Sequence, residues 1–315
     1  MQSMLIAFLL FPINFILFSL NLAFCGSLVF LGGLVKFFIP IESVQEKLYA
    51  PMHMVYRLWS INNRRIMFWA NNIDWQVQGA EDLDQDGWYL LIANHQSWLD
   101  ILVLTIFALD KIPEPKFFLK DSLKKLPFLG MACWSLEMPF MKRYSKAFLV
   151  KNPHLKGQDI ETTKASCKAF EHNPTTIINF VEGTRLTLAK HRAQSSPFKY
   201  LLRPKAGGIA FTLQALGDRF DKILNITLVY PDNPGHVMKD MLKGNLKTII
   251  IHVEPVEVNK ALIGDYFHDP VFKEDFQQWL NTVWTQKDHQ IELMLAERES
   301  QTTHHNFDHQ IPLGR

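Results

Sequence analysis

Residues 88–100 decide the predicted fold and read WYLLIANHQSWLD. The six residues from Trp88 to Ala93 are almost continuously apolar, as in a strand that is buried on both faces of a parallel sheet. Polar residues follow at once, and they bring His95 and Asp100 to the end of that strand. Open α/β sheets place their ligands at the carboxyl ends of their strands. The stretch therefore predicts both an α/β fold and a candidate site.

The strand at 88–93 is one of several short apolar runs that alternate with longer helical patterns. Strands are predicted at 73–78, 88–93, 116–119, 138–141, 175–181, 223–230 and 248–258, and helices at 98–108, 160–172, 206–217 and 272–297. Strands separated by helices are typical of a mixed, largely parallel sheet flanked by helices. We therefore predict an α/β domain over residues 73–297, followed by a disordered tail over residues 298–315.

The N-terminal region has the composition of a membrane anchor. Residues 4–35 carry no charge, and 24 of these 32 positions are apolar. A continuous helix of this length would measure ~48 Å, whereas the hydrocarbon core of a bilayer is ~30 Å thick. The segment must therefore tilt, kink or fold back, and Pro12, Asn14, Gly32 and Gly33 are the candidate break points. A single tilted span, which we favour, and a re-entrant hairpin both remain open.

Basic residues follow this segment, and the short N-terminal side has none. They are Lys36, Lys47, Arg57, Arg64 and Arg65. The positive-inside rule therefore places the rest of the chain in the cytoplasm. Residues 51–75 mix apolar and aromatic side chains with arginines, which predicts an amphipathic helix in the membrane interface or one packed on the domain. We expect residues 1–72 to form the membrane anchor.

Composition and missing motifs exclude several classes of protein. The chain has 315 residues, and its 33 Lys and Arg residues nearly balance its 31 Asp and Glu residues. The net charge therefore does not indicate binding to nucleic acid. Cys25, Cys133 and Cys167 are too few and too scattered for a disulfide framework or a zinc site. The serine-hydrolase elbow, the zincin helix motif, the P-loop and the dinucleotide fingerprint are absent from the sequence.

His95 and Asp100 form the first candidate constellation. A helix that begins near Ser97 would hold Asp100 in its first turn, where the carboxylate could accept a hydrogen bond from the imidazole and fix its tautomer. His95 would then be a general base. The alternative is structural, because Ser97 to Asp100 also has the spacing of a helix capping box.

A second constellation follows the strand at 175–181 and consists of Glu182, Gly183, Thr184 and Arg185. Arginine suits bidentate capture of phosphate. The alternative is a turn with a surface ion pair. Six basic residues and no acidic ones lie between Gly183 and Gly217, namely Arg185, Lys190, Arg192, Lys199, Arg203 and Lys205. Lys205 directly precedes a predicted helix, whose N-terminus can also hold an anion. We therefore predict a phosphorylated small molecule or lipid as the partner, and no nucleic acid, because no aromatic stacking motif accompanies the basic residues.

These blocks together resemble the PlsC-type family of glycerolipid acyltransferases, whose members make phosphatidic acid from lysophosphatidic acid. His95 and Asp100 match the first block of the family, and Glu182 to Arg185 match its phosphate-binding block. The strand 138–143, which ends in Arg143, and the segment before it with Lys120, Pro127 and Gly130 also match, in the same order over about residues 73–235. The closest resemblance is to bacterial inner-membrane acyltransferases of the YihG type, and residues 223–231 are also similar to the lysocardiolipin and lysophosphatidylinositol branch.

The sequence departs from the family pattern at two places. Val181 stands where many members have a proline before the Glu-Gly-Thr-Arg block. The strand of the fourth block also lacks its usual proline, which appears only at Pro231. These departures leave the acceptor open.

The resemblance implies a membrane-bound enzyme that transfers a fatty acyl chain from acyl-CoA or acyl-carrier protein to the free hydroxyl of a lysophospholipid such as 1-acylglycerol-3-phosphate. His95 would act as the base and Asp100 would orient it. The acceptor would be bound by Glu182, Gly183, Thr184 and Arg185, with support from Arg143 and Lys205. The resemblance implies no metal and no cofactor, and it places the enzyme in the inner membrane with its catalytic domain facing the cytoplasm. A non-catalytic lipid-binding scaffold is the main alternative, and a hydrolase that releases acyl chains to water is another.

Overall fold

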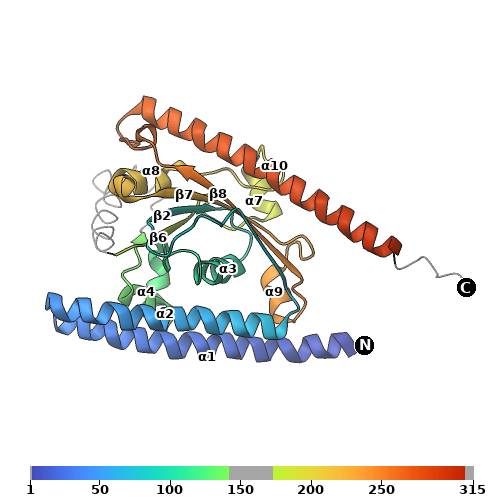
Figure 1. Ribbon diagram of the computed structural model, residues 1–315, viewed down its shortest axis with the longest axis horizontal. Coiled ribbons are helices and arrows are strands. Elements are labelled where there is room, and N and C mark those ends of the chain that lie inside the picture. Colours follow the sequence, from blue (N-terminus) through green and yellow to red (C-terminus); the bar gives the residue numbers. More distant parts are fainter. Residues whose placement is uncertain (1, 142–172, 309–315) are drawn as a thin grey trace, which may run out of the picture.

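A six-stranded sheet forms the centre of the computed structural model, which describes residues 2–141 and 173–308 (Figure 1). Its strands are β1 (Asp74–Gln78), β2 (Tyr89–Ala93), β3 (Pro115–Phe117), β6 (Thr176–Phe180), β7 (Lys222–Val229) and β8 (Thr248–Glu257). They lie in the order β1-β8-β7-β2-β6-β3. From β7 to β3 all neighbours are parallel, and β8 is antiparallel to β7 and parallel to β1. The predicted mixed, largely parallel sheet is confirmed.

One predicted strand is divided in the structure. The expected strand 116–119 becomes β3, which pairs with β6, and β4 (Leu119–Lys120), which pairs with β5 (Phe140–Met141) in a separate small sheet. The chain changes its partner strand at Phe118, and an apolar run gives no sign of such a change.

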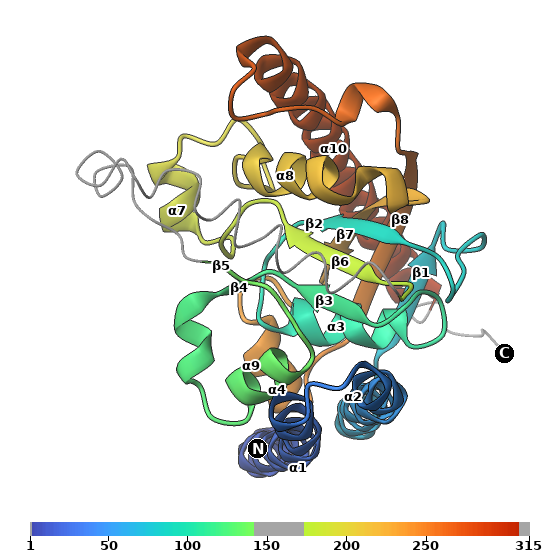
Figure 2. The same ribbon diagram turned by 90° about the vertical axis from the view of Figure 1, so that its left-hand side faces the viewer.

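Helices cover both faces of the sheet (Figures 1 and 2). On one side lie α1 (Gln2–Phe38), α2 (Glu42–Ala70), α3 (Leu99–Ala108), α4 (Leu129–Ser135) and α9 (Val237–Leu242), with a 3₁₀ turn at Asp121–Lys125. On the other side lie α8 (Ala206–Leu216) and the long α10 (Pro270–Asp308), with 3₁₀ turns at Gly217–Arg219 and Lys260–Leu262. The short α7 (Leu188–Ala193) follows the loop after β6. The predicted helix 160–172 lies outside the described residues.

Strand β2 shows how the core is built. Leu91 and Ala93 belong to the apolar cluster on the α3 side, and Leu90 and Ile92 belong to the cluster on the α8 and α10 side. All four side chains are fully buried. The uninterrupted apolar run that predicted a strand buried on both faces is thus explained by helices on each side of the sheet.

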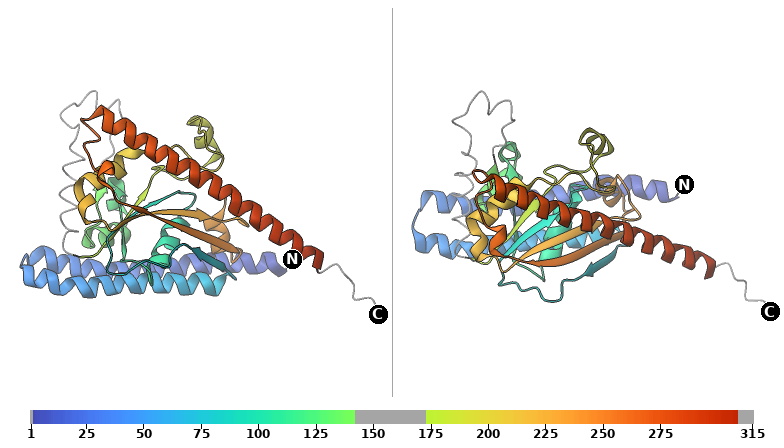
Figure 3. Two further views of the ribbon diagram at one scale, coloured as in Figure 1. Left: turned by 45° about the horizontal axis from the view of Figure 1, so that its top comes forward. Right: turned by 90° about the horizontal axis from the view of Figure 1, so that it is seen from above.

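Helix α1 is continuous, so none of the candidate break points within residues 4–35 interrupts it. Within the described ranges it is the one helix long and apolar enough, by length and composition, to cross a membrane. Gly33 serves close packing instead of a break, because a Cβ added there would lie 2.1 Å from Ser135 Oγ on α4. Nearer the other end of α1, Asn14 Nδ2 donates a hydrogen bond of 2.9 Å to the carbonyl of Leu242 on α9. These two contacts hold α1 along the domain, antiparallel to α2 (Figure 3).

Two boundaries differ from the predictions. Buried residues recur along α2 from Met52 to Met67, so this helix packs on the domain, and it ends at Ala70 because residues 74–78 enter β1. The disordered tail predicted from residue 298 is wrong for residues 298–308, which continue α10. Arg298 fastens this part of the helix to the sheet through ion pairs with Asp232 at 3.2 Å and Asp74 at 3.6 Å.

Candidate active site

The strand order brings three loops to one edge of the sheet. Strand β2 lies between β6 and β7, and all three are parallel, so their carboxyl ends meet there. His95 follows β2, Glu182 follows β6, and Tyr230 follows β7. The sequence motifs predicted His95 and Glu182 as site residues at this edge, and they did not include Tyr230.

The turn after β2 is fixed to β7 by side-chain amides. Asn94 is fully buried and exchanges two hydrogen bonds with the backbone of Leu228, each 2.9 Å long. Gln96 Nε2 donates to the same carbonyl at 3.0 Å. This pairing holds the backbone on both sides of His95.

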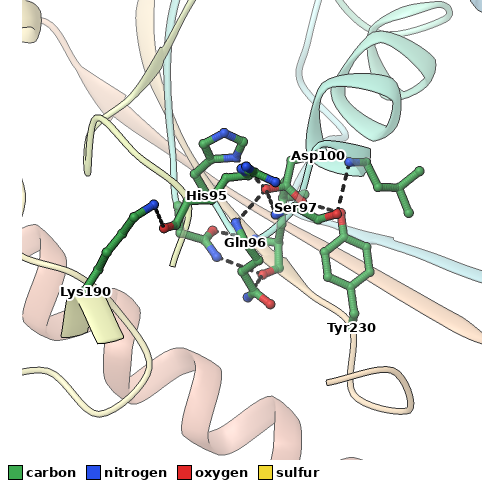
Figure 4. A network of polar contacts seen from close by, with 10 residues as sticks. His95, Gln96, Ser97, Asp100, Lys190 and Tyr230 are labelled. Atoms are coloured by element: carbon green, nitrogen blue, oxygen red, sulfur yellow. Dashed lines mark hydrogen bonds and ion pairs between the residues drawn. The ribbon is translucent and has the colours of Figure 1, made fainter. Parts of the chain in front are cut away.

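His95 and Asp100 form a hydrogen-bonded pair (Figure 4). The distance between His95 Nδ1 and Asp100 Oδ2 is 2.8 Å, and the imidazole is 12% exposed while the carboxylate is fully buried. Because a carboxylate only accepts, Nδ1 carries a proton, and in the neutral imidazole Nε2 keeps its lone pair. The predicted pair is thus confirmed as a contact, with the geometry of an oriented general base.

Asp100 is held by three further donors. Its Oδ2 also accepts from the backbone N–H groups of Gln96 at 2.6 Å and Ser97 at 2.9 Å, and its Oδ1 accepts from the Tyr230 hydroxyl at 2.7 Å. Burial raises the pKa of Tyr230 well above its ordinary value, so the phenol stays a donor. The bond from Ser97 is the carboxylate half of a capping box, and the structural and functional interpretations of Asp100 therefore both hold.

The loop after β6 packs directly against this turn. The Phe180 ring stacks on the His95 ring, with centroids 4.0 Å apart and planes 16° apart. The backbone N–H of Leu186 donates to the His95 carbonyl at 2.7 Å. The two predicted motifs are therefore joined through backbone and side-chain contacts.

Glu182 lies inside the domain and not on its surface. It is fully buried, and neither of its carboxylate oxygens reaches hydrogen-bond geometry with a described residue. Burial raises its pKa, and this effect is opposed by the charge of Lys287 and by the backbone N–H groups of Leu202 and His95. Glu182 therefore lies on the buried side of the turn, and its part in acceptor binding stays a prediction.

The remaining residues of the block form the outer part of the turn. Gly183 has a φ of +68°, which favours glycine. The Arg185 guanidinium lies 4.7 Å from the centre of the Trp98 ring, and Lys190 Nζ donates to Thr184 Oγ1 at 2.7 Å and to the Arg185 carbonyl at 3.1 Å. Two cations thus stand close to the His95 pair, at half-buried positions suited to an anion.

Comparisons with known proteins agree with this site. A family model described as "Acyltransferase" matches residues 74–230, which include both motifs and Tyr230. The chain belongs to this PlsC-type acyltransferase family. The closer resemblance to the YihG type stays a prediction.

The relatives are distant and longer than the matched region. Lysocardiolipin acyltransferase 1 of Gallus gallus is 27% identical over 219 residues, which cover 64% of this chain and 52% of the relative. The 2-acyl-1-lysophosphatidylinositol acyltransferase of Saccharomyces cerevisiae is 25% identical over 241 residues, which cover 62% of this chain and 59% of the relative. The chain spans about half the length of the curated relatives it matches.

The fold also has a solved counterpart. The crystal structure of PlsC, the 1-acyl-sn-glycerophosphate (LPA) acyltransferase of Thermotoga maritima, matches with a TM-score of 0.57 and 19% sequence identity. The match covers 93% of this chain and 97% of that one. The shared fold therefore extends beyond residues 74–230.

An apolar cavity adjoins this site. It lies between α1, α3 and α4 and is lined by Leu22, Cys25, Gly26, Val29, Tyr56, Trp59, Trp98, Ile101, Phe117, Leu119, Leu123, Leu129, Ala132, Cys133, Leu136 and Met138. Trp98 lines the cavity and contacts Arg185. Phe117 also lines the cavity, and its ring stacks with that of Phe180 at a centroid distance of 6.3 Å. The Phe180 ring in turn stacks on the His95 ring. No sequence motif predicted this cavity, because its walls come from separate helices.

Three other predictions concern this site. Lys205 is exposed at the N-cap of α8, and its backbone N–H donates to the Val181 carbonyl at 2.9 Å, beside the turn that holds Arg185. Arg143 lies outside the described residues. Among the residues that the structure describes, no group of three or more His, Cys, Asp or Glu could hold a metal ion.

Proposed function

We propose that this protein transfers an acyl group from an acyl thioester to the free hydroxyl of a lysophospholipid such as 1-acylglycerol-3-phosphate. The single observation that carries the proposal is the His95–Asp100 pair, with Nδ1 bound at 2.8 Å and Nε2 left without a partner among the described residues. The names of its relatives support the class of acceptor, since they are acyltransferases for lysocardiolipin, lysophosphatidylinositol and acylglycerol phosphate.

The proposed reaction balances without a covalent enzyme intermediate. His95 Nε2 takes the proton of the acceptor hydroxyl while that oxygen attacks the thioester carbonyl carbon. When the tetrahedral intermediate collapses, the carbon–sulfur bond breaks and the imidazolium returns the proton to the leaving thiol. Asp100 stabilises the imidazolium, and Tyr230 holds the other oxygen of that carboxylate. The imidazole supplies the base that the reaction needs, so we propose no cofactor, and either acyl-CoA or acyl-carrier protein could be the donor.

The acceptor phosphate has a candidate position beside this base. Arg185 stands on the turn that contacts the His95 backbone, and Trp98 lies against one side of its guanidinium. Lys190 of α7 donates to the same turn. A phosphate on these cations would keep a nearby hydroxyl within reach of His95. Lys205 and Arg143 remain proposed contributors to the same charge.

The acyl chain has a candidate position in the cavity between α1, α3 and α4. Its wall is apolar, and Trp98 and Phe117 connect it to the reacting groups. An acyl chain buried there would leave its carbonyl near His95, because the rings of Phe117 and Phe180 connect the cavity wall to the His95 ring.

The helical pair α1 and α2 supports a membrane location. Large apolar side chains of α1 are exposed, among them Phe8 at 76% and Phe15 at 58%. Since α1 is held along the domain toward both of its ends, we propose that it lies in the interface of the cytoplasmic leaflet of the inner membrane and does not stand across the bilayer. The lipid acceptor would then enter sideways, and the soluble thioester would arrive from the cytoplasm.

Acyl transfer by purified protein in detergent tests the proposal. Labelled acyl-CoA and acyl-carrier protein are offered with a panel of lysophospholipids, and the diacyl product is measured. His95→Ala should lower kcat by about 10²–10⁴-fold. His268→Ala is the matched control, because it removes a His–Asp pair of 2.8 Å whose imidazole is 80% exposed, and it should leave the rate unchanged.

Two outcomes would contradict the proposal. Binding of lysophospholipid without product from either donor would favour the scaffold. Release of free fatty acid at a rate independent of the acceptor would favour the hydrolase.

A further inference from the structure

The loop in front of α4 exposes basic and apolar side chains together. Its five consecutive residues are all exposed, namely Lys124, Lys125, Leu126, Pro127 and Phe128, and we call them the α4 loop. Leu126 is 45% exposed and Phe128 is 39% exposed, and Trp134 on α4 itself is 42% exposed. A single exposed apolar residue needs no explanation, but several that lie close together indicate an interaction surface.

The backbone of the α4 loop is strained at Phe128. Its φ of 59° and ψ of −52° lie outside the regions that residues other than glycine favour. The N–H of Leu129 donates to the carbonyl of Pro127 at 2.7 Å, which closes a γ-turn of the rare form with a positive φ at its centre. Strain of this kind is concentrated at functional positions. The chain thus keeps an exposed phenylalanine where the backbone favours glycine.

Hydrogen bonds and close packing fix the position of the α4 loop. The N–H of Gly130 donates to the carbonyl of Leu126 at 2.8 Å, and the N–H of Ala132 donates to the carbonyl of Phe128 at 2.9 Å. On the side of α1, a Cβ added to Gly26 would lie 3.1 Å from the Phe128 carbonyl oxygen and 3.3 Å from the Phe128 Cβ. The α4 loop is therefore held against α1.

The exposed side chains of the α4 loop continue the exposed apolar surface of α1. Figure 2 shows the loop before α4 reaching down to α1. On α4, the Trp134 ring lies 6.2 Å from that of Phe30 and 6.1 Å from that of Phe37, measured between centroids, and Phe37 is 64% exposed. Apolar side chains with lysines at their border are typical of segments that lie in a membrane interface, where the lysine head groups reach the lipid headgroups.

The same part of the chain forms a wall of the apolar cavity. Leu123 and Leu129, which flank the α4 loop, line the cavity, and Gly26 of α1 lines it at the point where Phe128 packs. The α4 loop and α1 therefore lie side by side at this wall. A lipid surface that contacted both would be next to the cavity.

We propose that the α4 loop is a second membrane contact, in which Leu126 and Phe128 insert among the lipid tails of an anionic bilayer and Lys124 and Lys125 lie at the depth of the headgroups. The contact holds the cavity next to the bilayer from which the lysophospholipid acceptor enters. This role in acceptor entry rests on the proposed function.

A bilayer fits this surface better than an acidic protein does. An acidic protein would explain the lysines and the apolar side chains of the α4 loop alone. A bilayer also explains the adjoining exposed residues of α1, such as Leu31 at 57% and Phe38 at 74%. It contacts the two elements together.

Phe128→Gly separates a membrane role from a role in folding. The change removes the exposed ring and relieves the strained φ, so the unfolding temperature should not fall. Partition into vesicles of equal parts phosphatidylglycerol and phosphatidylcholine should become about tenfold weaker, because the apolar ring is lost. Phe267→Gly is the matched control, since this 46% exposed residue precedes α10 and stacks on Tyr266, on the opposite face of the sheet. It should leave partition unchanged.

Lys125 tests the charge of the α4 loop, since Lys124 pairs with Asp121 at 2.7 Å. Lys125→Gln should weaken partition into the anionic vesicles about fivefold and leave partition into pure phosphatidylcholine vesicles unchanged. Lys273→Gln, at an exposed position on α10, should change neither. Leu126→Gln provides a second apolar change with a normal backbone, and it should weaken partition about fivefold.

Acyl transfer on vesicles tests the link to the acceptor. In Phe128→Gly, the lipid concentration that gives half the maximal rate should rise about tenfold, whereas the rate at saturating lipid should stay unchanged. A lower rate at saturating lipid with normal partition would assign Phe128 to the chemical step and overturn the inference.

Vesicle binding decides the inference independently of turnover. Equal partition of the wild type, Phe128→Gly and Leu126→Gln would overturn it. Unchanged partition together with weaker use of acyl-carrier protein by Lys125→Gln would overturn it in favour of a protein partner. Absence of acyl transfer in the wild type would instead contradict the proposed function, and the partition of the variants would still show whether the α4 loop meets the lipid.

Discussion

Tyr230 is the residue of the site that sequence motifs missed, and its hydroxyl bond to Asp100 gives a direct test. Tyr230→Phe removes one of four hydrogen bonds to that carboxylate and leaves the ring in place. A net loss of ~1 kcal/mol corresponds to a roughly fivefold lower kcat, with little change in KM for the acceptor. Steady-state kinetics of the purified variant measure this split. A higher KM at unchanged kcat would instead place Tyr230 in substrate binding.

Arg185 should act on binding more than on chemistry. Arg185→Ala removes the guanidinium beside Trp98, so KM for a phosphate-bearing acceptor should rise about tenfold while KM for the acyl donor stays constant. Arg192→Ala is the control, since Arg192 lies on the neighbouring α7 at an exposed position. Equal effects of both changes on acceptor KM would show a diffuse electrostatic role and no specific phosphate contact.

The sequence predicted the residues of the site better than their surroundings. His95, Asp100 and Arg185 stand in local motifs, and their roles follow from side-chain chemistry at the end of a strand. Tyr230 reaches the same site from a position 130 residues after Asp100, and only the strand order brings it there.

At the scale of elements, the contact between α1 and α4 depends on a missing side chain. A Cβ on Gly33 would lie 2.1 Å from Ser135 Oγ, so Gly33→Ala should force the helices apart and lower the free energy of unfolding by about 1–3 kcal/mol. Adding Ser135→Gly should recover part of this loss. Thermal unfolding in detergent measures both variants.

Gly207→Ala is the matched control for this prediction. Gly207 lies in α8, and an added Cβ would find its nearest neighbour at 4.0 Å, on the Tyr266 ring. The change should be neutral or stabilise the protein by up to ~1 kcal/mol, because alanine favours helix. A loss as large as that of Gly33→Ala would mean that glycine matters in these helices for a reason other than the α1–α4 contact.

The elements that were predicted wrongly share one physical cause. Gly32 and Gly33 were candidate break points of α1, and residues 298–308 were expected to be disordered. In both cases the decisive contacts are with distant parts of the chain, namely Ser135 for Gly33 and Asp232 for Arg298. Composition and local propensity cannot report such contacts, and tertiary packing overrides them.

At the scale of the whole molecule, the sheet separates two faces of the domain. The reacting groups and the apolar cavity lie toward α1, α3 and α4, and α8 and α10 cover the opposite face. The sequence predicted the sheet and its flanking helices because period and run length are local properties. It could not place α1 along the domain, since that arrangement depends on contacts near both ends of the helix.

Membrane binding through α1 is the last prediction, and it concerns this division of faces. Phe8 and Phe15 are seven residues apart on one side of α1 and are 76% and 58% exposed, so neither supports the core. Replacing both by glutamate should remove about 3 kcal/mol of apolar transfer, which is a roughly hundredfold weaker partition into vesicles, at an unchanged unfolding temperature. Val271→Glu, at a position 69% exposed on α10, should not affect partition, because α10 lies on the opposite face of the sheet. Co-sedimentation with anionic phospholipid vesicles measures the difference, and equal binding of all three proteins would show that α1 does not meet the lipid.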